Sequence, residues 1–180
     1  MKKIALVLFL LSFLMIDAQE TSTERRNDII GDPIMLIAVP AANVTYERIL
    51  TEHNGLGLNV IIGLGEDNTG FSQFSPYYRF YFGKNFASGF FLEGFVPITT
   101  FKDHEMIFIS NEYGGYYTES EKEIKRTAAG AGFGVGGKWV VRNGLVIEAS
   151  GGIARLFGDT GDDIFSEVTG RIMAGIGYRF

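Results

Sequence analysis

The chain contains no cysteine, and it has only four prolines and two histidines among its 180 residues. The absence of cysteine excludes both a disulfide framework and a lipid-modified cysteine at the N-terminus. The scarcity of histidine leaves little material for acid–base catalysis. Stability and function must therefore come from other residue types.

Long apolar runs are also missing beyond the first 18 residues, so the rest of the chain offers no helix that could span a bilayer. The formal net charge is −5 and no long basic run occurs, which argues against nucleic acid as a partner. The chain is instead rich in glycine, with 24 residues, and in aromatic residues, at 14%. This combination is typical of tightly curved strands with aromatic residues at membrane interfaces, so any membrane span must be built from strands.

The N-terminus has the anatomy of a secretory signal peptide. Lys2 and Lys3 precede an apolar run over 4–16, and Ala18 offers a cleavage site. A membrane anchor helix is the alternative, but the run is short for a bilayer span. We therefore predict a signal peptide over 1–18, a periplasmic leader over 19–33 and a barrel domain over 34–180. Closed strand ladders would stabilise such an exported domain without disulfides.

The last eleven residues alternate between two kinds of side chain, as a strand with two different faces requires. One face carries Ile172, Ala174, Ile176, Tyr178 and Phe180; the other carries Arg171, Met173, Gly175, Gly177 and Arg179. An apolar face turned to lipid and a small or charged face turned inward are typical of a transmembrane barrel strand. Tyr178 and Phe180 also resemble the C-terminal assembly signal of outer-membrane barrels.

The same alternation recurs along the chain and predicts an all-β fold, an eight-stranded antiparallel transmembrane β-barrel of the outer-membrane type. The other expected strands are 34–39, which is short and ends at Pro40, then 43–50, 56–65, 72–83, 87–99, 128–141 and 145–154. The connections alternate between short (51–55, 83–86, 142–144) and longer (66–71, 100–127, 158–167).

Short connections on the periplasmic side and longer ones outside are the asymmetry of outer-membrane barrels. The Asn-Gly pairs in 51–55 and 142–144 predict hairpin turns. Part of the longest connection, 106–117, could extend the flanking strands as a hairpin.

An eight-stranded barrel has room inside only for side chains. The charged residues expected there are Glu47, Arg79, Glu93, Lys138, Glu148, Arg171 and Arg179. Buried charges must be paired, so we predict an ion-pair network that plugs the lumen, with Tyr77 and Tyr81 contributing hydroxyl groups. A proton or ion path is the alternative role for these charges. Phe91 and Phe95 share the inward face, which a bulge or a soluble apolar core would explain equally well.

Motifs for catalysis, metals or nucleotides are weak. Asp103-His104 with Ser110 or Ser120 lacks the spacing of a hydrolase or acyltransferase site. The acidic loop with Asp159, Asp162, Asp163 and Glu167 lacks the regular ligand spacing of a calcium loop. The glycine-rich stretch 130–137 continues into a strand and not into the helix that phosphate binding needs. We expect no enzyme activity and no cofactor.

The chain resembles a widespread family of small outer-membrane barrels, the domain of unknown function 3575. The resemblance lies in 43–50 with Tyr46-Glu47, 77–81 with 89–94, 132–138, 145–148 with Gly151-Gly152, and 175–179. It implies a barrel fold and an outer-membrane location. It implies no known activity and carries over no catalytic residues.

These patterns favour a non-enzymatic barrel, structural or adhesive, in the outer membrane of a Gram-negative-type cell. Its expected partners are membrane lipid, the barrel-assembly machinery and an extracellular partner bound through loops 100–127 and 158–167. One alternative is a secreted soluble barrel that holds an apolar ligand, which requires the apolar faces to point inward. Another is an outer-membrane enzyme acting on lipid or peptide at the outer rim.

Overall fold

The computed structural model describes residues 25–65, 70–110, 117–158 and 167–180, without the side chains of 103–123 and Arg142. The elements are β1 (Asn27–Gly31), α2 (Pro33–Ala38), β2 (Ala41–Ile49), β3 (Asn54–Gly63), β4 (Ser72–Tyr81), β5 (Gly89–Phe95), β6 (Ile98–Ser110), β7 (Tyr117–Val140), the short 3-10 turn η3 (Arg142–Gly144), β8 (Leu145–Gly158) and β9 (Val168–Arg179).

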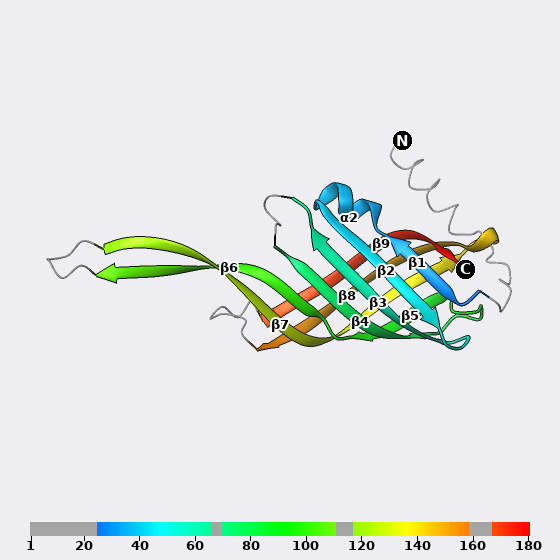
Figure 1. Cartoon of the computed structure of the whole chain (residues 1–180). Helices are drawn as coiled ribbons and strands as arrows, with labels where there is room; N and C mark the ends of the chain where they lie inside the picture. The colour runs from blue at the N-terminus through cyan, green and yellow to red at the C-terminus, as the bar shows by residue number, and fades with distance from the viewer. Residues whose placement is uncertain (1–24, 66–69, 111–116, 159–166) are drawn as a thin grey trace, which may run out of the picture.

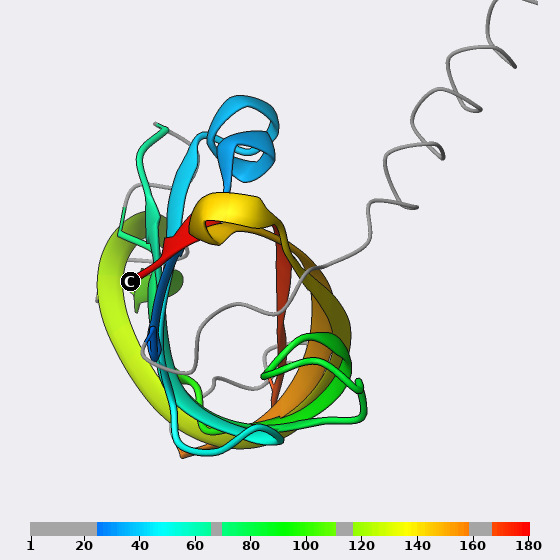
Figure 2. The ribbon, with the colours of Figure 1, turned by 90° about the vertical axis from the view of Figure 1, so that its right-hand side faces the viewer.

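The strands form one closed antiparallel barrel, seen end-on in Figure 2. Strands that are neighbours along the chain pair with each other, except for β5 and β6, and β1 pairs with β9 to close the ring. β5 and β6 occupy one position in the wall, because both pair with β4 on one side and with β7 on the other. Val96 and Pro97 separate them, and proline cannot donate to the ladder. The predicted eight-stranded antiparallel barrel is therefore confirmed.

The two ends of the barrel differ in shape (Figure 1). We call the end where Asn27 pairs with Phe180 the terminal end, and the opposite end the hairpin end. At the hairpin end, β6 and β7 stay paired from Ile98↔Ala129 to Ser110↔Tyr117. The residues expected as a loop over 100–127 are thus largely a long two-stranded hairpin, and Gly114-Gly115 lie outside the described residues. The predicted hairpin extension is correct, but it begins earlier than 106.

The first strand is not where the sequence pattern placed it. Residues 34–39, expected as a strand, lie in helix α2 and at its C-cap. The Asp32 side chain caps the helix by accepting from the Met35 backbone N–H, and Pro33 occupies the first turn, where its missing N–H costs nothing. The real first strand is β1, inside the segment 19–33 expected to be a leader.

The two predicted Asn-Gly turns have different outcomes. Asn143 (φ 72°) and Gly144 (φ 90°) both have positive φ, as a tight hairpin turn requires. Asn54 and Gly55 already belong to β3, and the chain reverses just before them, over 50–53. Gly55 is needed for space instead, because a Cβ there would overlap the Glu47 carboxylate.

Candidate functional site: a charged interior inside an apolar wall

Among the described residues, eight buried charged side chains on inward strand positions share the barrel interior, four acidic and four basic; a ninth buried charged residue, Asp32, caps helix α2. The eight are Asp28, Glu47, Arg79, Glu93, Lys138, Glu148, Arg171 and Arg179. Each occupies an inward position of its strand, between outward neighbours. All seven residues expected from the sequence lie here, and Asp28 on β1 joins them.

Arg79 on β4 lies at the centre of the network. Its guanidinium contacts Glu47 at 2.8 Å, Glu93 at 2.8 Å and Glu148 at 2.6 Å. Its two Nη atoms both donate to Glu148, the bidentate geometry that makes arginine–carboxylate pairs strong. One cation thus joins three strands far apart in the sequence.

Lys138 on β7 makes a second link. Its Nζ lies 2.9 Å from Asp28 and 2.7 Å from Glu47, with Glu148 at 3.7 Å. Glu47 also accepts from the hydroxyl groups of Tyr77, at 3.2 Å, and Tyr81, at 2.6 Å. The lone pairs of this buried carboxylate are therefore well satisfied, which a charge at this depth requires.

Arg179 closes the terminal end. Its Nε and Nη2 donate to the two oxygens of Asp28 at 2.7 and 2.9 Å. Because Asp28 lies on β1 and Arg179 on β9, this pair joins the strands that close the ring. The same guanidinium donates to the backbone oxygens of Phe86 and Ala87 at 2.9 Å each. The β4–β5 connection is thereby held across the mouth, and Ala87 is completely buried.

Arg171 lies further toward the hairpin end and has fewer partners. Its Nη2 contacts Glu93 at 2.8 Å, while Nη1 has no hydrogen-bond partner among the described residues and neither does Glu93 Oε1. Nearby polar side chains hydrogen-bond mainly to one another: Asn59 donates to Asn43 and Thr45, and Thr99 and Thr169 donate to Gln73. The interior thus changes from densely ion-paired to mainly uncharged and polar.

The rings of Phe91 and Phe95 lie against the buried arginine side chains. The Arg79 guanidinium lies 4.2 Å from the ring centre of Phe91 and 4.3 Å from that of Tyr77. Arg171 lies 4.6 Å from Tyr77 and 5.3 Å from Phe95. Ring faces attract cations, and they do so more strongly when water is excluded. These inward aromatic residues therefore need neither a bulge nor a soluble apolar core.

Glycines on the facing strands make room for these large side chains. A Cβ on Gly57 would overlap the Tyr77 ring, and a Cβ on Gly136 would lie 2.5 Å from the ring of Phe91. Gly134 similarly faces Glu93. Within the glycine-rich stretch 130–137, Gly134 and Gly136 thus face interior side chains, whereas Phe133 and Val135 lie on the outer wall. The chain continues from this stretch along β7 into β8.

Most outward side chains of the described wall are apolar, with exceptions such as Arg48 on β2 and Arg155 on β8. The exposed large apolar residues of the wall include Ile29, Val44, Leu56, Ile62, Phe74, Phe80, Leu92, Phe133, Val135, Ile147, Ile153, Ile172 and Ile176. Tyr178 and Phe180, the expected assembly signal, are also exposed, at 46% and 52%. A soluble barrel with an apolar ligand needs the reverse arrangement. Its main requirement is not met in the described part of the chain.

The remaining candidates gain no support. His53 lies in the β2–β3 turn, where its ring stacks on Phe80. Asp103, His104, Ser110 and Ser120 lie in the β6–β7 hairpin, where only the backbone is described, and the calcium candidates Asp159, Asp162 and Asp163 fall outside the described residues. The described part of the chain contains no cluster of His, Asp or Glu suited to a metal ion. Nor does it contain a helix long and apolar enough to cross a membrane.

Sequence reasoning missed Asp28 because β1 has only five residues and follows a polar segment. A weak signal existed: in 27–31 (NDIIG), Asp28 and Ile30 share one face and Ile29 lies on the other. The predicted interior held three acids and four bases, and Asp28 makes the two numbers equal.

Comparison with known proteins supports the fold. No family model matches the chain, and no curated protein matches it. Among solved structures, the chain is similar to the N-terminal β-barrel domain of Pseudomonas aeruginosa OprF, with a TM-score of 0.51 and 16% sequence identity. The match covers 86% of this chain and 96% of that domain. At this identity the likeness concerns the fold alone.

Proposed function

We propose that this protein is an integral β-barrel of the outer membrane with a closed lumen and no catalytic role. The N-terminal signal peptide predicted over 1–18 would direct its export. Tyr178 and Phe180 would then present it to the barrel-assembly machinery. The resemblance to the domain of unknown function 3575 points to the same location and remains a prediction.

One observation carries this proposal: the wall is apolar on the outside and charged on the inside. Soluble monomers rarely expose contiguous apolar patches larger than a few hundred Å². Here the exposed apolar residues follow one another around the ring, from Ile29 on β1 to Ile176 on β9. In a lipid bilayer this apolar surface contacts acyl chains and not water, and the closed barrel satisfies its backbone groups internally.

The packing of the interior favours a structural role for the barrel and argues against a channel. Arg79 and Lys138 each join carboxylates from different strands, and Arg179 on β9 pairs with Asp28 on β1. All three basic side chains are completely buried. The connection with Phe86 and Ala87 covers the terminal mouth as well. Side chains packed in this way would leave no continuous path for ions along the described part of the lumen.

The hairpin end is the part available to a partner. With the terminal end in the periplasm, the β6–β7 hairpin projects outward from the cell. Its segment 100–127 and the connection 158–167 would be the contact regions for an extracellular partner. An adhesive or binding role therefore belongs to this end of the barrel.

Two measurements on cells and bilayers test the proposal. In intact cells, added protease should cleave an epitope inserted at Gly114-Gly115 but spare one placed after Asn143, in the opposite turn. The purified protein should give no stable conductance in planar bilayers. Cleavage only at Asn143 would contradict the orientation, and a steady open channel would contradict the closed lumen.

Deleting Phe180 tests the assembly signal separately. We expect at least a tenfold loss of assembled protein, whereas the Phe157→Ala variant, which removes another exposed aromatic residue, should assemble normally. Equal assembly of the wild-type and Phe180-deleted chains would remove the signal from the proposal.

A further inference from the structure

The wall of the barrel has a gap beyond the short strand β1, on the side of the hairpin end. β1 pairs with β2 only at Val44–Arg48 and with β9 only at Ile176–Arg179. One further backbone bond runs from the Asp32 N–H to the Asn43 oxygen, at 3.0 Å. Otherwise the adjoining residues of β2, from 41 to 43, and of β9, from 168 to 175, have no strand between them. The ladder is interrupted where the first and last strands of the barrel meet.

Side chains bridge this gap. Asp32 Oδ2 accepts from the Ala174 backbone N–H at 3.0 Å and from Asn43 Nδ2 at 3.4 Å. Asn43 Nδ2 also donates to the backbone oxygen of Ile172, at 2.9 Å. Asp32 and Asn43 thus satisfy each other and the two strand edges, and their bonded atoms need no further ligand.

Helix α2 lies outside this gap, next to β2 and β9 (Figure 2). Its sequence, PIMLIA, has no polar side chain, and none of its residues is buried against the barrel. Ile34 is 60% exposed and Ile37 83% exposed. A helix that is apolar all round is stable only in an apolar environment, so α2 belongs in lipid.

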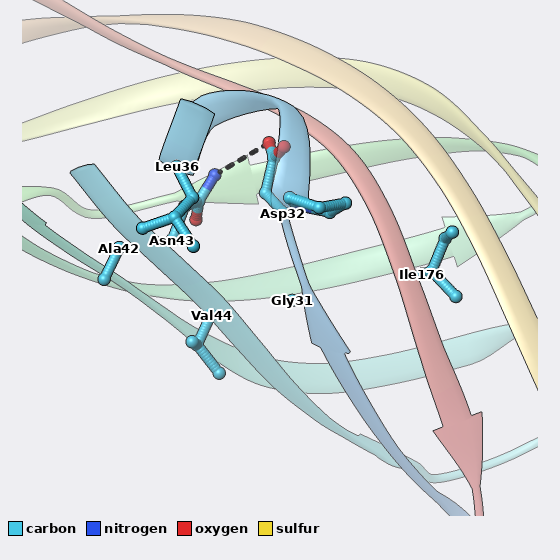
Figure 3. A pocket seen from close by; sticks show the side chains of 8 residues that line it. Gly31, Asp32, Leu36, Ala42, Asn43, Val44 and Ile176 are labelled. Atoms are coloured by element: carbon cyan, nitrogen blue, oxygen red, sulfur yellow. Dashed lines mark hydrogen bonds between the residues drawn. The ribbon is translucent and has the colours of Figure 1, made fainter. Parts of the chain in front are cut away.

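A groove of about 380 Å³ separates α2 from the wall. Figure 3 shows Leu36 of α2 on one side, Ala42 and Val44 of β2 on another and Ile176 of β9 opposite. The surface exposed in the groove is almost wholly apolar. Its volume falls within the ~300–1,000 Å³ range of small-molecule sites.

We propose that this groove holds one acyl chain of a membrane lipid. The groove is continuous with the lipid-facing wall, because Val44 and Ile176 belong both to its lining and to the exposed apolar surface. Its two polar lining residues, Asp32 and Asn43, already use their side-chain atoms in bonds within the protein, so the groove favours an apolar ligand. The bound chain fills the space beside the interrupted ladder, where Asp32 and Asn43 already satisfy the backbone of Ile172 and Ala174. This inference rests on the proposed membrane location.

Native mass spectrometry tests it on the protein folded in vesicles of 1-palmitoyl-2-oleoylphosphatidylethanolamine and released in detergent. The wild-type protein should keep one lipid under activation that removes the detergent. Ala42→Trp fills the groove, and the fraction with bound lipid should fall by at least about tenfold, since losing the burial of two methylene groups has that effect. Ala149→Trp, a matched change on the outward face of β8, should keep the lipid.

The outcomes separate the two proposals. The same samples are run on a gel before and after heating. If no sample changes its migration on heating, the proposal of a membrane barrel is wrong. If the shift is normal but Ala42→Trp and the wild type retain lipid equally, or neither retains it, only the lipid groove is wrong. Should Ala42→Trp fail to fold, Ile176→Trp blocks the groove from the other wall and gives the same two readings.

A dimer in place of a bound lipid would also overturn the groove proposal. It would appear in the same spectra as twice the protein mass.

Discussion

The two halves of the barrel interior satisfy their charges to different degrees. Toward the terminal end, Arg79 contacts three carboxylates and Lys138 contacts two within hydrogen-bond distance. Toward the hairpin end, Arg171 contacts one carboxylate, and one nitrogen of its guanidinium has no protein partner. The first region is a shared network, whereas the second contains a single pair among uncharged polar groups.

This difference indicates where the barrel is fixed. A buried charge that loses its partner is costly, so a cation shared by several carboxylates couples the strands that carry them. Arg79, Lys138 and Arg179 lie in the half where the first and last strands join. In the half around Arg171, Arg171 Nη1 and Glu93 Oε1 have no hydrogen-bond partner among the described residues. Buried water can hydrogen-bond to such atoms. We expect mutations in the first half to have the larger effects.

The largest effect should come from Arg79→Met. This change leaves Glu47, Glu93 and Glu148 without their common cation, and removing one partner of a buried charge pair costs about 3–5 kcal/mol. The free energy of unfolding, measured by urea titration in phosphatidylcholine vesicles, should fall by that amount. A loss below about 1 kcal/mol would show that the network does not stabilise the barrel.

Arg171→Met should cost less, about 2 kcal/mol. Among the described carboxylates only Glu93 loses a partner, and it keeps the contact with Arg79 Nε at 2.8 Å. The ring contacts of Arg171 with Tyr77 and Phe95 are lost as well. The same urea titration measures the loss. If Arg171→Met proved as costly as Arg79→Met, the contrast between the two halves would disappear.

Phe91→Leu should cost about 1–2 kcal/mol, since it removes the ring that faces Arg79 and leaves a small void. Phe90→Leu is the matched control, because Phe90 is 53% exposed on the outer wall. Its effect should stay within about 0.5 kcal/mol. Equal losses in the two variants would argue against the arginine–ring contact as a stabilising interaction.

The smallest effect should come from Arg155→Met. Arg155 pairs with Glu167 at 3.0 Å on the surface, where its side chain is 68% exposed. Exposed pairs contribute no more than about 1 kcal/mol, and salt weakens them further. If the free energy of unfolding fell nearly as much as in Arg79→Met, burial inside the barrel would not explain how strongly a charged residue stabilises the protein.

Alternation along the strands predicted most of the wall from the sequence. In β4, the outward Phe74, Tyr78 and Phe80 and the inward Tyr77 and Arg79 all lie on their expected faces. Period-two patterns are reliable here because a shift by one residue would move every charge into the wall.

The first strand and the following helix were missed for a physical reason. Five residues are too few to show alternation, and a short apolar run such as 34–39 fits a strand or a helix equally well. Asp32 followed by Pro33 was the available signal for a helix start. The partners of Arg79 could not be predicted either, because contacts across the lumen depend on the register of every strand between them.

Folding with and without lipid tests the central claim most directly. The chain from residue 19 to Phe180, unfolded in urea, is diluted into plain buffer or into phosphatidylcholine vesicles, and its gel migration is compared before and after heating. We predict a heat-dependent shift only with vesicles, because the apolar wall needs lipid. A soluble monomer that folds cooperatively in buffer alone would contradict the account.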